Sequence, residues 1–165
     1  MDRKTTFQRK IFSANEKEVL SALSSLSEKG YSEIVTDLIT LYSETKSELI
    51  KEQTIFILNN LKDKNSVLYF MNGLKTIKDN EIRIQLISAC WQNGLDYSPF
   101  LSFFTDIIAQ EDISNAIEAF SVIESNISLL SEEQTESLKK HIIKTRKKGE
   151  INNTSLFAEV EKLIQ

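Results

Sequence analysis

Residues 47–77, SELIKEQTIFILNNLKDKNSVLYFMNGLKTI, and residues 80–108, NEIRIQLISACWQNGLDYSPFLSFFTDII, repeat one pattern. Each stretch begins with polar capping residues, continues as an amphipathic helix, turns, and ends in a second amphipathic helix. Weaker copies of the unit precede and follow this pair. The repetition predicts stacked helical hairpins, because a single hairpin cannot bury its apolar face alone.

The apolar positions of the predicted second helices recur every 33 residues. The first helices show a comparable register, with spacings of 35, 32 and 33 residues. Chance produces one such register more readily than two registers across several units. The second helices align as Ile34/Val67/Phe100, Leu38/Met71/Phe104 and Leu41/Leu74/Ile107, and the first helices align as Leu20/Ile55/Ile87/Phe120 and Leu23/Leu58/Cys90/Ile123.

The composition favours an all-α globular protein. Of its 165 residues, 41% are hydrophobic and 27% are charged, and only one Pro and four Gly interrupt the chain. We expect a basic leader at residues 1–14, partly ordered, followed by a single repeat domain at residues 15–165. No uncharged apolar run approaches the ~18 residues that span a bilayer, so a cytoplasmic protein without membrane insertion is expected.

Polar residues before the apolar runs predict where the helices begin. Glycines predict two helix ends, at Gly30 and at Asn93-Gly94. A short final helix from Thr154 to Ile164 is expected to cover the open end of the fold. The predicted helix starts are Asn15, Thr45 in a Thr45-x-x-Glu48 capping box, Asn65, Asn80, Ser98-Pro99, Asp112 and Ser131 in a Ser131-x-x-Gln134 capping box.

Ile82-Arg83 stands near the start of a first helix and is echoed by Ile50-Lys51, and a short turn runs from Lys62 to Asn65. In these two local features the units resemble HEAT repeats. The resemblance covers roughly residues 15–148. It implies an α-α superhelix of about four hairpins with a short C-terminal capping helix. It also implies a non-catalytic scaffold that binds a protein or peptide partner on the concave face formed by the second helices.

The repeat alignment predicts which side chains face that partner. Thr36, Tyr69 and Ser102 share one position outside the predicted core, and Ile39, Asn72 and Thr105 share another. Alternatively, the ring of Tyr69 packs on a neighbouring helix pair. The predicted partner-binding residues are Tyr69, Asn72, Ser102 and Thr105.

A basic stretch at residues 139–148, KKHIIKTRKK, supports a second function. Some DNA glycosylases are built from similar helical repeats, so the resemblance allows a nucleic-acid-binding or DNA-glycosylase-like protein. Nucleic acid is the less favoured partner, since the net charge is −4 and a solvated helix end that complements the helix dipole is the simpler interpretation. The candidate contacts are Lys139, Lys140, Lys144, Arg146, Lys147 and Lys148.

No pattern of catalytic or metal-ligating residues emerges from the sequence. Cys90 aligns with Leu58 and Leu23, which predicts a core residue rather than a nucleophile. His141 is the only histidine, so a site with several His ligands is excluded. We therefore expect no enzyme activity, cofactor or metal. Gly73 lies within a predicted helix, where it would allow close approach of either another helix or a partner.

Overall fold

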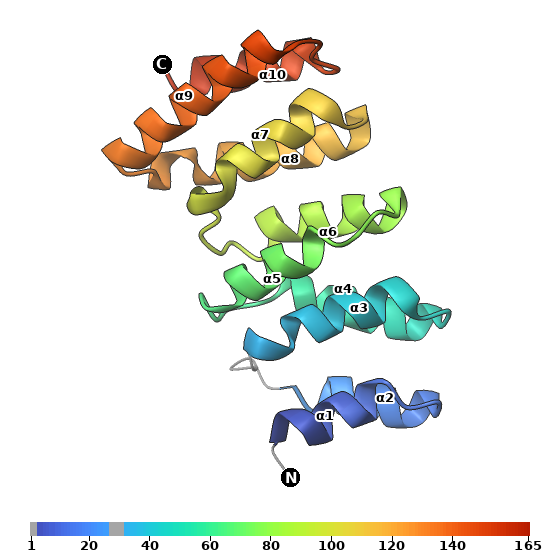
Figure 1. Cartoon of the computed structure of the whole chain (residues 1–165). Helices are drawn as coiled ribbons and strands as arrows, with labels where there is room; N and C mark the ends of the chain where they lie inside the picture. The colour runs from blue at the N-terminus through green and yellow to red at the C-terminus, as the bar shows by residue number, and fades with distance from the viewer. Residues whose placement is uncertain (1–2, 27–31) are drawn as a thin grey trace. The chain divides into compact units, whose positions relative to one another are not determined.

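A computed structural model describes residues 3–26 and 32–165 (Figure 1). These residues form helices and turns without strands, which confirms the expected all-α class. The predicted stop at Gly30 lies outside the described residues. The helices are α1 Arg3–Ile11, α2 Glu16–Ser24, α3 Val35–Glu44, α4 Glu48–Asn59, α5 Ser66–Leu74, α6 Asn80–Gln92, α7 Leu101–Gln110, α8 Ile113–Asn126, α9 Glu132–Lys148 and α10 Thr154–Leu163, with 3₁₀ turns η1 Ser32–Ile34, η2 Ser98–Phe100 and η3 Ile127–Leu129.

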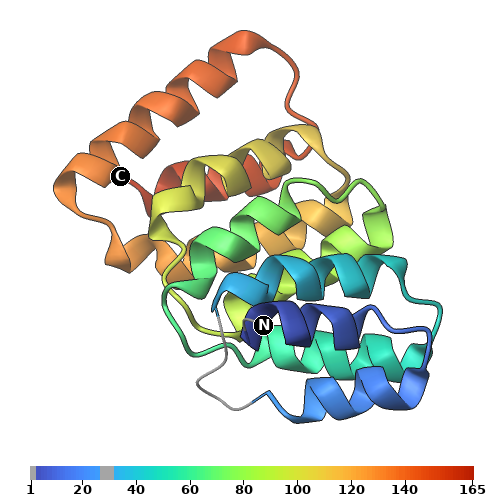
Figure 2. The same cartoon turned by 60° about the horizontal axis from the view of Figure 1, so that its bottom comes forward.

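The chain divides into two compact units, unit 1 at Met1–Leu95 and unit 2 at Asp96–Gln165. In unit 1, α1 packs on α2, α3 packs on α4 and α5, and α4 is flanked by α2 and α6 (Figure 2). Helix α3 therefore packs more closely on α4 than on α2, with which the repeat pattern pairs it. Five of its ten residues are buried, so α3 contacts more than one neighbour. A single repeat domain over residues 15–165 stays a prediction.

The core of unit 1 follows the repeat register at most positions. Leu23, Leu58 and Cys90 are each at most 1% exposed. Two positions depart from it, because Leu20 of α2 and Ile55 of α4 are only half-buried. The neighbour of Ile55, Thr54, is fully buried instead. The Thr54 hydroxyl donates a hydrogen bond to the Ile50 carbonyl oxygen at 2.6 Å, and this contact allows a polar side chain in the core.

The residues expected as a basic leader contain helix α1. Its Ile11 is fully buried, and the Gln8 amide donates a hydrogen bond to the Asp37 carboxylate of α3 at 2.8 Å. Phe12, directly after the helix, is 46% exposed. Helix α1 is thus tied to the rest of unit 1 by a buried apolar side chain, by the contact with α3 and by an ion pair between Lys4 and Glu33 at 3.6 Å.

Unit 2 is centred on α7, which packs against α8, α9 and α10. Its Phe104 and Ile107 are buried as the repeat register predicts. In α8 the register holds at one of its two positions, because Ile123 is fully buried whereas Phe120 is only half-buried. The buried face of α8 instead contains Ala116 and Ala119, because small side chains allow two helix axes to approach closely. The remaining buried residues of α8 are Asn115, Val122, Ile123 and Asn126.

Side-chain caps confirm three predicted helix starts. Asn15 accepts a hydrogen bond from the Lys17 N–H, and Asp112 accepts from the N–H groups of Ser114 and Asn115. Ser131 and Gln134 form the predicted capping box at the start of α9. These contacts satisfy backbone donors that have no partner inside the helix.

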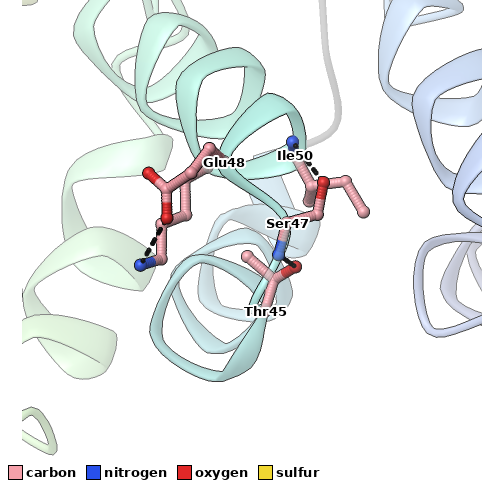
Figure 3. Close-up of polar contacts among 5 residues, drawn as sticks. Thr45, Ser47, Glu48 and Ile50 are labelled. Carbon is pink, nitrogen blue, oxygen red and sulfur yellow. Dashed lines mark hydrogen bonds and ion pairs between the residues drawn. The ribbon is translucent and has the colours of Figure 1, made fainter.

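Two other predicted caps were wrong by a short shift in sequence. Figure 3 shows that α4 is capped by Ser47, which accepts from the Ile50 N–H at 3.4 Å, whereas Thr45 accepts from the Ser47 N–H at 3.2 Å. Asp79 caps α6 in place of Asn80, because its carboxylate reaches the Ile82 N–H at 3.1 Å. Helix α5 begins directly after Asn65, as predicted, although the Asn65 side chain makes no capping hydrogen bond.

At Gly73, helices α5 and α3 of unit 1 approach each other closely. A Cβ atom at this position would lie 2.7 Å from Cδ1 and 3.3 Å from Cβ of Ile39. The side chain of Ile39, on α3, therefore occupies the space that a larger residue on α5 would need. Of the two interpretations open at the sequence level, close helix packing is the one observed.

Candidate binding surfaces

The predicted partner-binding residues of unit 1 both lie on α5. Asn72 is exposed, whereas Tyr69 is half-buried. The Thr36 hydroxyl of α3 donates a hydrogen bond to the Tyr69 carbonyl oxygen at 3.1 Å, which links two residues that the repeat alignment places at equivalent positions. Ile39, expected to be exposed, is 1% exposed because it packs against Gly73.

The two predicted residues of unit 2 lie on α7 and differ in exposure. Ser102 is half-buried. Thr105 was predicted to face a partner, and this prediction was wrong, because the residue is fully buried. Its hydroxyl donates a hydrogen bond to the Leu101 carbonyl oxygen at 2.9 Å, so a β-branched polar residue fits inside the core without an unpaired group.

Sequence analysis missed an apolar stripe on the outer face of α4. Leu49 and Phe56 are 57% and 67% exposed, and the exposed Glu52 lies between them on the same face. Ile50, Thr54 and Leu58 on the opposite face are buried. The signal was the spacing of residues 49, 52 and 56, which places them on one side of the helix away from the predicted core. We call Leu49, Glu52 and Phe56 the α4 stripe.

A buried phenol, Tyr42, lies on α3 close to the charge of Glu48 at the start of α4. Burial raises the pKa of Tyr42 on α3, and the negative charge of Glu48 on α4 raises it further. The carboxylate of Glu48 also contacts the ammonium group of Lys51 at 3.4 Å. Ionisation of Tyr42 therefore opposes the packing of α3 against the beginning of α4.

Two of the six basic residues predicted as nucleic-acid contacts on α9 are engaged within unit 2. Arg146 forms a two-pronged contact with the Glu161 carboxylate of α10, with both N–O distances at 2.6 Å. This hydrogen bonding raises the pKa of Arg146. Its guanidinium also lies 5.1 Å from the centre of the Phe157 ring. Lys139 lies 3.7 Å from the Glu136 carboxylate, one turn earlier in α9.

The other four basic residues of α9 are exposed and form no ion pair within the described ranges. With the 53% exposed Ile143, they line a shallow cavity of about 510 Å³. Spacings of three, four, seven and eight residues place these side chains on one face of the helix. We call Lys140, Lys144, Lys147 and Lys148 the lysine face.

His141 joins α9 to α7. Its Nε2 atom lies 2.8 Å from the Asp106 carboxylate, and both side chains border a cavity of about 280 Å³. Lys144, Lys148 and Glu150 also line this cavity, so charges of both signs meet there. The sequence suggested no partner for His141, because Asp106 is 35 residues away along the chain.

Chemically reactive groups are sparse in the described part of the chain. Cys90 is fully buried, as predicted for a core residue, and its thiol donates to the Leu86 carbonyl oxygen at 3.4 Å. Among residues 3–26 and 32–165, no three His, Cys, Asp or Glu side chains come together as metal ligands. In the same ranges, no helix is both long and apolar enough to cross a membrane.

Neither a scan against protein-family models nor a search of characterised proteins finds a match for this sequence. The resemblance to HEAT repeats therefore stays a prediction from the sequence pattern.

Proposed function

We propose that the protein is a HEAT-like α-α superhelix of about four hairpins closed by a short C-terminal helix. The support is the equal burial of equivalent positions, since Leu23, Leu58, Cys90 and Ile123 are each at most 1% exposed. Buried asparagines add to it. Asn93 and Asn126 lie 33 residues apart, at the ends of α6 and α8, and are 4% and 3% exposed.

With this architecture, the protein would act as a non-catalytic scaffold that binds a protein partner. The observation that carries the proposal is the α4 stripe, in which Leu49 and Phe56 are more than half exposed on a helix whose other face is buried. Aromatic side chains are enriched in the cores of protein interfaces. Because α4 is fixed by its neighbours before binding, little conformational freedom is lost when the partner docks.

The chemistry of the stripe specifies the partner. Glu52 lies between the two apolar side chains and forms no ion pair among the described residues. A complementary partner is an amphipathic helix of another protein that presents apolar side chains flanked by Lys or Arg. That Tyr69, Asn72 and Ser102 also contact the partner stays a prediction. The proposal rests on α4 because its exposed apolar side chains are larger.

The test begins with a photoreactive benzoyl-phenylalanine at position 56, which cross-links whatever contacts α4 in extracts of the source cells. The cross-linked segment is then synthesised and titrated against the purified protein. We expect Phe56→Ser to weaken binding at least ~10-fold, a loss of ~1.4 kcal/mol. Glu52→Lys should also weaken binding, because it places like charges together.

Leu68→Ser is the matched control, because Leu68 is 56% exposed but lies on α5. It should leave the affinity unchanged. The proposal fails if no segment is cross-linked, if Phe56→Ser binds like wild type, or if Leu68→Ser weakens binding equally. Circular dichroism of each variant confirms that helicity is retained.

A further inference from the structure

The positive charge of unit 2 is concentrated in one short segment. The unit contains seven Lys and Arg residues and twelve Asp and Glu residues. Six of the seven basic residues lie within residues 139–148, on the C-terminal half of α9. A polyanion would be repelled by most of this unit, so α9 is the one part of it that could attract such a ligand.

Several carboxylates near the lysine face already pair with other side chains of unit 2. Glu136 contacts Lys139, Asp106 contacts His141, and Glu161 contacts Arg146. Among residues 3–26 and 32–165, no carboxylate forms an ion pair with the four ammonium groups of the lysine face. Glu150 also lies nearby, because it lines the smaller cavity together with Lys144 and Lys148.

We propose that the lysine face binds the phosphate backbone of nucleic acid. From Lys140 to Lys148 the helix rises about 12 Å, at about 1.5 Å per residue. Duplex DNA carries one charge per ~1.7 Å, so about seven phosphates fall within that length. The duplex therefore offers more phosphates along this length than the four lysines need as partners.

The composition of the face favours nucleic acid over other anionic partners. A membrane-bound helix inserts an apolar face, but Leu138 and Ile142 of α9 are buried in unit 2 and only Ile143 is exposed nearby. An acidic peptide would form solvent-exposed ion pairs, each worth no more than about 1 kcal/mol. Nucleic acid gains additional affinity from the release of condensed counter-ions.

The test is fluorescence anisotropy of the full chain with a labelled 20-base-pair duplex between 25 and 200 mM salt. Four phosphate contacts predict a slope of about −3.6 in log K against log salt, or roughly a hundredfold loss of affinity between 50 and 200 mM. In the Lys144→Gln/Lys147→Gln variant, the slope should fall to about −1.8. Glu150→Gln should strengthen binding, because it removes a carboxylate that lines the smaller cavity beside Lys144 and Lys148.

The matched control is Lys62→Gln/Lys64→Gln, which removes the same charge from two exposed lysines of unit 1. It should retain the wild-type affinity and slope. The proposal is overturned by the absence of binding at 25 mM salt or by equal losses in the two double variants. Tighter binding to phosphatidylserine vesicles or polyglutamate than to the duplex would also overturn it, and would assign the face to a membrane or an acidic protein.

Discussion

Helices α4 and α9 each expose a candidate binding face, but different interactions hold them in place. Helix α4 buries Ile50, Thr54 and Leu58 and is enclosed by α2, α3 and α6. Helix α9 is longer, with 17 residues, yet only Leu138 and Ile142 are buried. Its position depends largely on polar contacts, from His141 to α7 and from Arg146 to α10.

The difference shows how the means of attachment determines which surface remains available. A helix fixed by apolar packing can expose apolar side chains, as Leu49 and Phe56 do, without losing its position. A helix fixed by a few ion pairs uses some of its charges for attachment and leaves the rest exposed. We therefore expect α9 to be more sensitive than α4 to changes in the residues that support it.

The largest effect is expected from Phe157→Ala in α10. Phe157 is fully buried, and Arg146 of α9 lies against its ring, so this side chain supports both helices. Removing it should lower the free energy of unfolding by about 3–5 kcal/mol, because it leaves a cavity and removes the surface on which Arg146 rests. Urea unfolding gives the magnitude, and hydrogen exchange should show a greater loss of amide protection in α9 than in α4.

Leu163→Ala provides the control on the same helix, because Leu163 is 40% exposed. It should cost less than about 1 kcal/mol. If both variants lost equal stability, or if amides of α4 and α9 lost protection equally, the proposed dependence of α9 on α10 would be wrong.

The sequence predicted the apolar register better than the polar details. Positions such as Leu58 and Phe104 were predictable, because helical periodicity selects the buried face. The caps at Ser47 and Asp79 were not, since neighbouring residues in each stretch have equivalent capping chemistry and only backbone geometry chooses between them.

The candidate surfaces were less predictable for a related reason. Thr105 is polar yet buried, because its hydroxyl finds an acceptor within its own helix. The exposure of Phe56 depends on which face α2, α3 and α6 cover, and the contact of His141 with Asp106 depends on how α7 and α9 meet. Both are consequences of tertiary packing.

A moderate effect is expected from Gly73→Ala, which tests close packing beside α4. Alanine favours helix by about 1 kcal/mol over glycine, but its Cβ would meet Ile39 at 2.7 Å. Overpacking typically costs 1–3 kcal/mol, so we expect a net loss of about 1 kcal/mol in urea unfolding. Ile39→Val removes the closest atom, Cδ1, and the double variant should recover part of that loss. A stabilising Gly73→Ala substitution would contradict the close approach.

The smallest effect is expected at alkaline pH, from the phenol of Tyr42 beside the start of α4. In the folded state, burial and then the charge of Glu48 raise the pKa of Tyr42 above its ordinary value of 10.0. The stability that the neutral phenol contributes is therefore fully present below pH 10. It is lost as the pH rises through the folded-state pKa. Tyr42→Phe cannot ionise, so between pH 9 and 11 it should lose less stability than wild type, by under about 1 kcal/mol. Glu48→Gln should show part of the same change, because it removes the smaller of the two effects that raise the pKa of Tyr42.

Parallel urea titrations of the three proteins at each pH would measure the difference. Identical alkaline losses of stability in wild type and Tyr42→Phe would show that this phenol does not limit the packing of α3 against α4.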